Sequence, residues 1–181
     1  MATPLRATEP TDAILAERAA AGDDRALAAL YKRHARYIAG VARRMMASDD
    51  EVDDVVQETF LIATESLGSL RDAGSVRAWL VRIAARRVSQ RWTNRSRFRR
   101  FLGALITTSA PRSEPEPLQA IGALGRALEA LPPELRAPWV LHHVEGETLP
   151  VVAATMSVSL ATVKRRIAEA TARLGEVGRA F

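Results

Sequence analysis

The spacing of apolar residues constrains the fold of this chain more than any other feature. From Asp12 onward they recur every three or four residues, and no stretch keeps the two-residue alternation of a β-strand between turn signals. The residues between them are mainly alanine, leucine, arginine and glutamate, which are strong helix formers. The sequence therefore predicts an all-α protein.

A change in composition divides the chain in two. The segment "TTSAPRSEPEP" collects serine, threonine and proline and contains little that a core could bury, which is typical of a linker. We therefore expect two small helical domains, at residues 12–98 and 118–178, joined by a flexible linker at residues 99–117. A length of 181 residues is compatible with this division.

The first domain is expected to begin with two helices separated at "AAGDD", where Asp23 or Asp24 provides the N-cap. In this pattern His34 stands alone within a helix interface. The second helix has one face that we expect to belong to the core, made of Leu27, Leu30, Tyr31, His34, Ile38, Val41 and Ala42.

Charge is distributed unevenly along the first domain. The segment "SDDEVDDVVQE" contains six carboxylates and no basic residue, whereas no acidic residue occurs between Asp72 and Glu114. That acid-free stretch includes eight arginines within residues 82–100. A solvated helix usually alternates its charges to form i,i+4 pairs. We therefore expect the counter-charges of this basic helix to lie on another molecule, and the two charged segments to bind different partners.

The basic helix has an apolar side and a polar side. The apolar side, expected to be buried, consists of Leu80, Val81, Ala84, Ala85, Val88 and Trp92. The polar side carries Arg82, Arg86 and Gln90, with Arg91 beside them. Arginine neutralises phosphates and glutamine can address base edges, so this side is a candidate nucleic-acid surface. A tryptophan at helical spacing, such as Trp79, is more often a core residue than a stacking platform. An RNA or a membrane surface would also attract arginines, although no broad apolar face remains for lipid.

The acidic helix is expected to present one polar face that includes a leucine. This face consists, at positions i, i+3, i+4 and i+7, of Asp54, Gln57, Glu58 and Leu61. Polar groups around an exposed leucine suit contact with a basic protein partner. A face that is merely solvated remains an equal alternative.

The second domain contains a helix-turn-helix pattern in "TLPVVAATMSVSLATVKRRIAEATARL". It predicts a short helix, a tight turn and a longer helix, at residues 149–156, 157–159 and 160–174. Ser159 is the expected N-cap of the longer helix, and Leu160 is expected in the core between the two helices. Thr162, Lys164 and Arg165 then face outward, as in a recognition helix that enters the major groove. An αα-hairpin with a solvated basic face is the alternative, because the pattern is degenerate.

No catalytic or metal-binding motif is evident. The chain has no cysteine, which excludes disulfides and cysteine-ligated metal sites, and it has no glycine-rich phosphate loop. His142, His143 and Glu145 are close in sequence, but their spacing does not bring them to one side of a helix. The first residues do not resemble a signal peptide, and no apolar run of roughly 20 residues occurs in the sequence. We expect a non-enzyme without cofactor or metal, in a reducing, cytoplasmic setting.

Four motifs occur together in one order: "DDVVQETFLIA", "SVRAWLVRIAARR", "LEALPPELRAPWVLHHVEGETL" and "VSLATVKRRIAEA". With these motifs, over about residues 12–174, the chain resembles the extracytoplasmic-function (ECF) group of the sigma-70 family of bacterial RNA polymerase sigma factors. The resemblance implies a factor that binds core RNA polymerase, recognises the −10 and −35 promoter elements and assists DNA melting.

The resemblance also implies a role for each domain, with residues 12–98 as region 2 and residues 118–178 as region 4. Docking on the β′ clamp helices of core polymerase would involve Asp54, Gln57, Glu58 and Leu61. Contacts with the −10 element, including a pocket for a flipped-out base, would involve Ser69, Leu70, Arg71, Arg82, Arg86, Gln90 and Arg91. Contacts with the −35 element would involve Ser159, Thr162, Lys164, Arg165 and Arg166. The β flap and promoter DNA are further implied partners, an anti-sigma factor is left open, and membrane insertion is not expected.

Three positions depart from the family pattern. Arg86 stands where asparagine is usual, Ser157 where the turn usually has glycine, and Glu169 where arginine is frequent. Serine has a β-carbon and adopts the backbone conformations of tight turns less readily than glycine does. Glu169 would repel a phosphate. The alternative function is a stand-alone helix-turn-helix regulator that acts without the polymerase. Such a regulator would have no need of the acidic face around Leu61.

Overall fold

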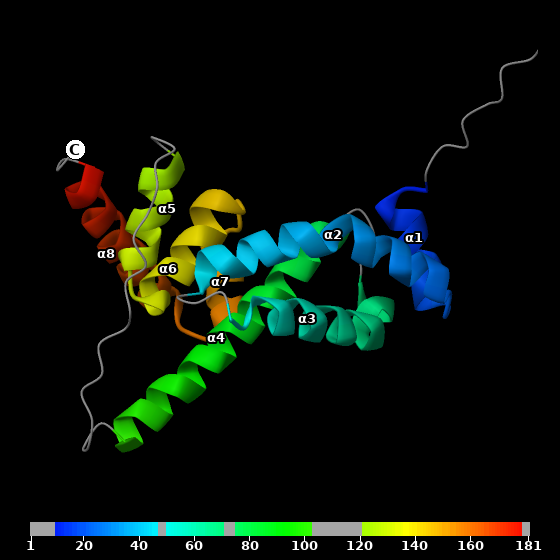
Figure 1. Ribbon diagram of the computed structural model, residues 1–181, viewed down its shortest axis with the longest axis horizontal. Coiled ribbons are helices and arrows are strands. Elements are labelled where there is room, and N and C mark those ends of the chain that lie inside the picture. The colour runs from blue at the N-terminus through cyan, green and yellow to red at the C-terminus, as the bar shows by residue number, and fades with distance from the viewer. Residues whose placement is uncertain (1–9, 47–49, 71–74, 103–120, 179–181) are drawn as a thin grey trace, which may run out of the picture.

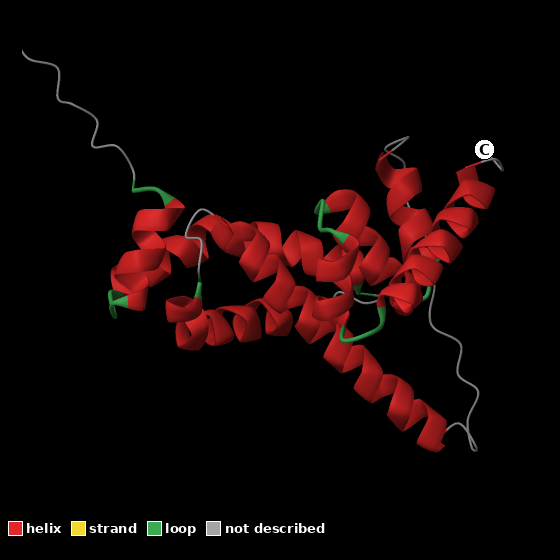
Figure 2. Ribbon diagram, turned by 180° about the vertical axis from the view of Figure 1, so that it is seen from behind, coloured by secondary structure: helices red, strands yellow, loops and turns green. Residues whose placement is uncertain are grey.

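All described elements of the computed structural model are helical, as the apolar spacing predicts (Figure 2). The structure describes residues 10–46, 50–70, 75–102 and 121–178. In chain order the α-helices are α1 (Asp12–Ala20), α2 (Asp24–Met45), α3 (Val52–Ser66), α4 (Val76–Leu102), α5 (Ile121–Ala130), α6 (Pro133–Trp139), α7 (Leu149–Met156) and α8 (Leu160–Gly178). A 3₁₀ turn (Leu67–Ser69) follows α3, and a π-helical turn (Val140–Val144) follows α6.

Helices α1 to α4 form the first domain, in which α2, α3 and α4 pack against one another and α1 lies at one end (Figure 1). Asp23 is the N-cap of α2, because its Oδ1 accepts hydrogen bonds from the backbone N–H groups of Arg25 and Ala26 at 2.9 and 3.2 Å. The buried side chains of this bundle include Leu30, Ile38, Val41, Met45, Val52, Val55, Phe60, Leu80, Val81, Ala84 and Val88. These positions confirm most of the apolar stripes predicted for the second and fourth helices, but Leu27 and Trp92, also expected in them, are only half-buried.

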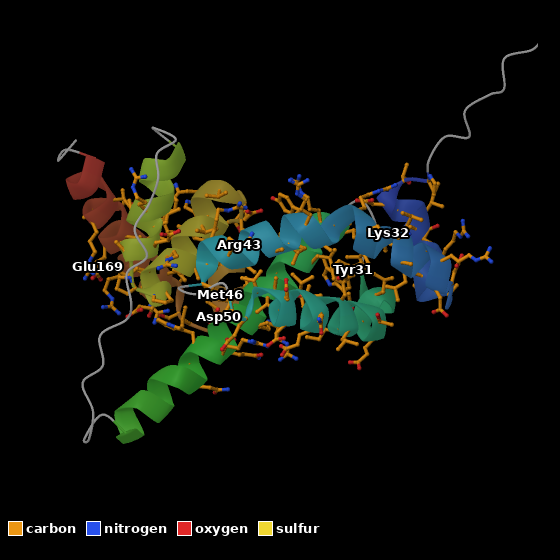
Figure 3. The ribbon with its side chains drawn as sticks, in the orientation of Figure 1. Tyr31, Lys32, Arg43, Met46, Asp50 and Glu169 are labelled. Atoms are coloured by element: carbon orange, nitrogen blue, oxygen red, sulfur yellow. The ribbon has the colours of Figure 1, made fainter. Side chains whose placement is uncertain are left out.

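Two further details of α2 differ from the expectation. Tyr31 was placed in the core, but it is 43 % exposed, and its ring meets the edge of Phe60 at a centroid distance of 4.8 Å (Figure 3). Successive residues of an α-helix are about 100° apart around its axis. Tyr31 therefore lies at the border of the apolar stripe rather than at its centre. His34 is buried as expected but is not alone, since its Nε2 lies 2.8 Å from Oδ2 of Asp12.

Helix α4 is longer than the composition indicated. It continues to Leu102, so residues 99–102, which were assigned to the linker, are helical. Arginine and leucine are good helix formers, and the serines and prolines that indicated a linker begin only after this point. The rest of the predicted linker lies outside the described residues.

The helix-turn-helix of the second domain is confirmed as α7, a turn at residues 157–159, and α8. Ser157 ends α7 in the left-handed conformation, with φ at 54°, where a β-carbon costs about 1–2 kcal/mol. Ser159 is the N-cap of α8, because its Oγ accepts from the backbone N–H of Thr162 at 3.1 Å. Leu160 was expected in the core but is exposed, since it begins the helix at the end of the seam that Val163 closes.

The two domains are in contact, which the sequence did not predict. Helix α7 packs on α4, and α6 packs on both α2 and α4. The buried Arg136 of α6 donates hydrogen bonds to the backbone carbonyls of Glu129 and Leu131 in its own domain and of Met46 in the other. Met46 follows α2 at the end that faces the second domain (Figure 3). One continuous cluster of buried apolar side chains therefore extends through both domains.

Candidate functional site

The outward face of α3 carries the four residues predicted for a protein contact. Leu61 is 66 % exposed, the highest value for a large apolar residue in the described part of the chain. Asp54 and Gln57 are exposed, and the side chain of Glu58 is 38 % exposed. The opposite side of α3 is anchored in the core by Val52, Val56, Phe60 and Ala63. The helix is thereby held with this polar face and its leucine toward solvent.

The carboxylates of this segment also pair with the basic helix. Arg91 lies 2.5 Å from Glu58 Oε1, 3.2 Å from Glu51 Oε2 and 3.7 Å from Asp54 Oδ2, and Arg87 lies 3.5 Å from Glu58 Oε2. Partial burial of Arg91 opposes its ionisation, but the hydrogen bonds with Glu58 and Glu51 prevail and raise its pKa. The expectation that the counter-charges of α4 lie on another molecule is therefore wrong for these two arginines. Packing of α3 against α4 brings the charges together.

Arg82 also has an intramolecular partner, in the second domain. Its Nη1 donates to Glu147 Oε1 at 3.2 Å, and the Glu147 side chain is only 11 % exposed. Arg86 differs, because it is exposed and forms no ion pair within the described residues. Gln90 is exposed as well and accepts a hydrogen bond from Arg87 at 2.8 Å.

A hollow of about 340 Å³ lies along this side of α4. It is lined by Ile62, Trp79, Arg82, Ile83, Arg86, Arg87 and Gln90. The lining combines apolar and aromatic side chains with guanidinium groups and one amide. Trp79 packs against the core with part of its surface and still borders the hollow, so the expectation of a core residue describes only one of its sides. This combination can accommodate a flat, polar-edged group next to a phosphate.

The loop before α4 contributes less to the described site. Ser69 is exposed, and its Oγ donates to the carbonyl of Ser66 at 2.6 Å. Leu70 is half-buried against the core. Arg71, predicted beside them, lies outside the described residues.

The first turns of α8 expose the predicted basic residues. Lys164 and Arg165 are exposed, Arg166 is half-buried, and Val163 between them is fully buried in the seam with α7. The hydroxyl of Thr162 lies 2.8 Å from that of Ser159, so both belong to the N-cap of the helix.

Glu169 does not present a free negative charge on α8. Its Oε1 lies 2.7 Å from Nη2 of Arg173, one turn further along the helix. The repulsion of a phosphate expected from Glu169 is therefore offset within the helix itself.

Sequence reasoning missed the acidic residues that face α4 and α2 across the domain interface. Glu145 accepts hydrogen bonds from Tyr37 Oη and Arg44 Nη2 at 2.5 and 3.1 Å, and Glu147 pairs with Arg82. The segment "EGE" is the signal that could have indicated them, but nothing local connects it to residues between 65 and 108 positions earlier. The described residues contain no cluster of three or more potential metal-binding side chains. None of the helices in these ranges is both long and apolar enough to span a membrane.

Comparison with known proteins supports each domain separately. Residues 30–98 match Sigma-70 region 2, and residues 121–174 match Sigma-70, region 4. RNA polymerase sigma factor CnrH of Cupriavidus metallidurans is 34 % identical over 179 residues, which cover 92 % of this chain and 93 % of the relative. ECF RNA polymerase sigma factor SigM of Mycobacterium tuberculosis is 32 % identical over 176 residues, 93 % of this chain and 85 % of the relative.

A solved structure shares the fold of almost the whole chain. It is CnrH in complex with the cytosolic domain of CnrY, and it is 30 % identical with a TM-score of 0.56. The match covers 93 % of this chain and 97 % of the solved chain. The chain therefore belongs to the ECF group of the sigma-70 family, whose members are non-enzymatic factors that bind core RNA polymerase and promoter DNA and direct promoter-specific transcription initiation.

Proposed function

We propose that the outward face of α3 docks on the clamp helices of the polymerase β′ subunit. The observation that carries this proposal is the exposure of Leu61 among polar neighbours. An apolar anchor within a charged rim supports binding to a basic partner, because the leucine becomes buried while the charges orient the encounter. Gln57 and Asp54 would meet the partner directly. Glu58 would contribute through the ion-pair cluster that it forms with α4.

The −10 element would be contacted by the polar side of α4, chiefly through Arg86 and Gln90. Both are exposed beside the hollow, and Arg86 has no intramolecular carboxylate partner among the described residues. Arg82 is paired with Glu147 and Arg91 with Glu58, so each would bind a phosphate only after its ion pair is broken. Ser69, Leu70 and Arg71 would complete a pocket for a flipped-out base of the melted strand.

The −35 element would be contacted by the start of α8, through Lys164 and Arg165. Their exposure on the second helix of a helix-turn-helix supports insertion into the major groove, where arginine can pair with guanine. Ser159, Thr162 and Arg166 lie close enough in sequence to contact the adjacent backbone. The same domain would meet the β flap of the polymerase.

The cellular setting follows from the family. We infer that the protein acts in the cytoplasm, where polymerase and promoters are found. The relative CnrH has been solved bound to the cytosolic domain of CnrY, which supports a further protein partner of this chain, and we propose that this partner is an anti-sigma factor.

Competition for core polymerase tests the docking face. The variant Leu61→Ser should bind core polymerase about tenfold or more weakly than wild type. Ile14→Ser is the matched control, because Ile14 is also an exposed apolar residue but lies on α1. Both variants should unfold at the wild-type temperature, since each changes an exposed side chain. Equal competition by Leu61→Ser and wild type would refute the docking face.

Promoter opening tests the basic face. Arg86→Glu should abolish open complexes in permanganate footprinting while core binding is retained, because a reversed charge repels the phosphates. The control is Arg36→Glu, an equal change at an exposed residue of α2. Normal opening by Arg86→Glu would contradict the assignment of α4 to the −10 element.

A further inference from the structure

The polar side chains that line the hollow on α4 are almost purely hydrogen-bond donors. They belong to three arginines, one tryptophan and one glutamine. Guanidinium and indole groups donate hydrogen bonds and accept none, whereas an amide can do both. Among the described residues that line the hollow, Gln90 is therefore the one with a side-chain acceptor. A group that enters the hollow meets a surface of donors.

The acceptor of Gln90 is already engaged. Its Oε1 accepts a hydrogen bond from Nη1 of Arg87 at 2.8 Å. This bond determines the orientation of the amide, because arginine has no acceptor that could receive the amide N–H groups. Arg87 is held in turn by Glu58, whose Oε2 lies 3.5 Å from it. Gln90 therefore directs its oxygen toward Arg87 and offers its NH₂ group to a ligand.

Arg86 is the guanidinium that a ligand can bind without breaking an ion pair. The guanidinium groups of Arg82 and Arg87 each lie beside a carboxylate, at 3.2 and 3.5 Å. Arg86 is exposed and forms no ion pair within the described residues. Its planar fork presents parallel N–H groups to one edge of a ligand. Release of Arg82 from its carboxylate would add donors and leave the character of the hollow unchanged.

The lining changes from apolar to polar along one face of α4. Trp79, Ile83, Arg86 and Gln90 follow one another at helical spacing, so they lie on the same side of the helix. At a rise of about 1.5 Å per residue, Ile83 and Arg86 are about 4.5 Å apart along the axis. Ile62 of α3 adds apolar surface. A planar ring can therefore pack against the apolar end while its edge meets Arg86.

The donors of this surface match one nucleobase edge. In the major groove guanine presents two neighbouring acceptors, O6 and N7, and arginine pairs with both. Adenine and cytosine each place an amino donor on this edge, where it would face the donors of Arg86 and Gln90. Thymine has a single acceptor beside a methyl group. A phosphate would satisfy the donors but would gain nothing from the apolar end of the hollow.

We propose that the hollow is a guanine-selective subsite for the −10 element and that Arg86 determines this selectivity. Arg86 binds O6 and N7, and the ring of the base packs against Trp79 and Ile83. The inference rests on the proposed contact between α4 and the −10 element, and it adds which base that contact selects.

Selection from a promoter library tests the preferred base. Holoenzyme reconstituted from this chain and core polymerase is allowed to form open complexes on duplexes randomised over both promoter elements. At one position of the −10 element, wild type should prefer guanine to adenine by about tenfold. Arg86→Lys keeps the charge but lacks the planar fork, so this preference should fall to about twofold or less. Arg86→Asn has one donor and one acceptor and should prefer adenine there.

Base analogues at the selected position test which atoms are bound. A deaza analogue of guanine, in which carbon replaces N7, should weaken binding of the wild-type holoenzyme about fivefold or more. Hypoxanthine keeps O6 and N7 but lacks the exocyclic amino group, so it should bind like guanine. A duplex with a preformed bubble over the −10 element removes effects of the analogues on melting. In Arg86→Lys the deaza analogue and guanine should bind equally.

The possible failures are distinguishable. A wild-type preference for another base at the position that Arg86 controls would overturn guanine selectivity. An equal loss on every sequence in Arg86→Asn would identify a phosphate contact, which overturns the subsite but leaves α4 at the −10 element. Unchanged affinity and selectivity in both variants would overturn the role of α4 itself. Both variants should unfold at the wild-type temperature, because Arg86 is exposed.

Discussion

Replacing Arg136 with methionine should destabilise the protein strongly, although no proposed binding partner touches it. The Arg136 side chain is almost completely buried, and its guanidinium donates to three backbone carbonyls, those of Met46, Glu129 and Leu131. Methionine has a similar length and no donor, so Arg136→Met removes these bonds while leaving the volume nearly filled.

The expected magnitude follows from two opposing contributions. Each hydrogen bond from a charged donor is worth about 1.5–3 kcal/mol, so three of them contribute about 4.5–9 kcal/mol. Burying the guanidinium opposes this by several kcal/mol, and the variant no longer bears that cost. We expect a net loss of about 2–4 kcal/mol in the free energy of unfolding. For a chain of this length, that corresponds to a melting temperature lower by about 5–15 °C.

Urea unfolding followed by circular dichroism measures this loss. The control is Arg126→Met, because Arg126 is a half-buried arginine on α5 for which no hydrogen bond or ion pair is seen within the described residues. Arg136→Lys should recover little stability, since one ammonium cannot reproduce the planar fork that reaches all three carbonyls. A loss below about 1 kcal/mol in Arg136→Met would refute the reasoning, because the desolvation of the guanidinium would then cancel its hydrogen bonds.

Three further changes have defined outcomes. Ser157→Gly should raise the free energy of unfolding by about 0.5–1 kcal/mol in urea titrations, because relief of about 1–2 kcal/mol of left-handed strain exceeds the added backbone entropy of glycine. Asp12→Asn should lower stability at neutral pH, because partial burial, which would raise the pKa of Asp12, is outweighed by the interactions with Arg33 and His34, which hold that pKa below its ordinary value. A lowered pKa stabilises the fold above the unfolded value of about 3.9, so the difference between variant and wild type should shrink as pH falls below that value in acid unfolding curves. Arg91→Met should cost about 1–2 kcal/mol in thermal unfolding, because it leaves Glu58 and its neighbouring carboxylates without their shared cation.

Each of these outcomes can fail in a recognisable way. A less stable Ser157→Gly would mean that the turn is held by its surroundings without strain. A stability difference for Asp12→Asn that stays constant down to pH 2 would contradict the lowered pKa. An unchanged melting temperature in Arg91→Met, compared with Arg86→Met as the unpaired control, would show that the carboxylates of α3 do not need Arg91.

The local structure of this protein was determined largely by its sequence. The apolar spacing predicted the buried stripes of α2 and α4, the N-cap at Asp23 was one of two expected, and Ser159 caps α8 as predicted. The family resemblance implies glycine at the turn position that Ser157 occupies, and this position has a positive φ. These features depend on residues within about one helical turn of each other, so a linear pattern contains the information they need.

The partners of the charged side chains were decided only by the tertiary structure. Arg91 and Glu58 are 33 residues apart in the chain, Arg82 and Glu147 are 65 apart, and Tyr37 and Glu145 are 108 apart. The periodicity of the sequence predicts which side of α4 is polar, but it does not predict which element faces that side. An acid-free helix therefore suggested an external counter-charge, whereas packing of α3 and of the second domain supplied carboxylates from within the chain. Which arginines remain available to a promoter depends on this packing, because an ion pair is set by distance in space and not by separation in sequence.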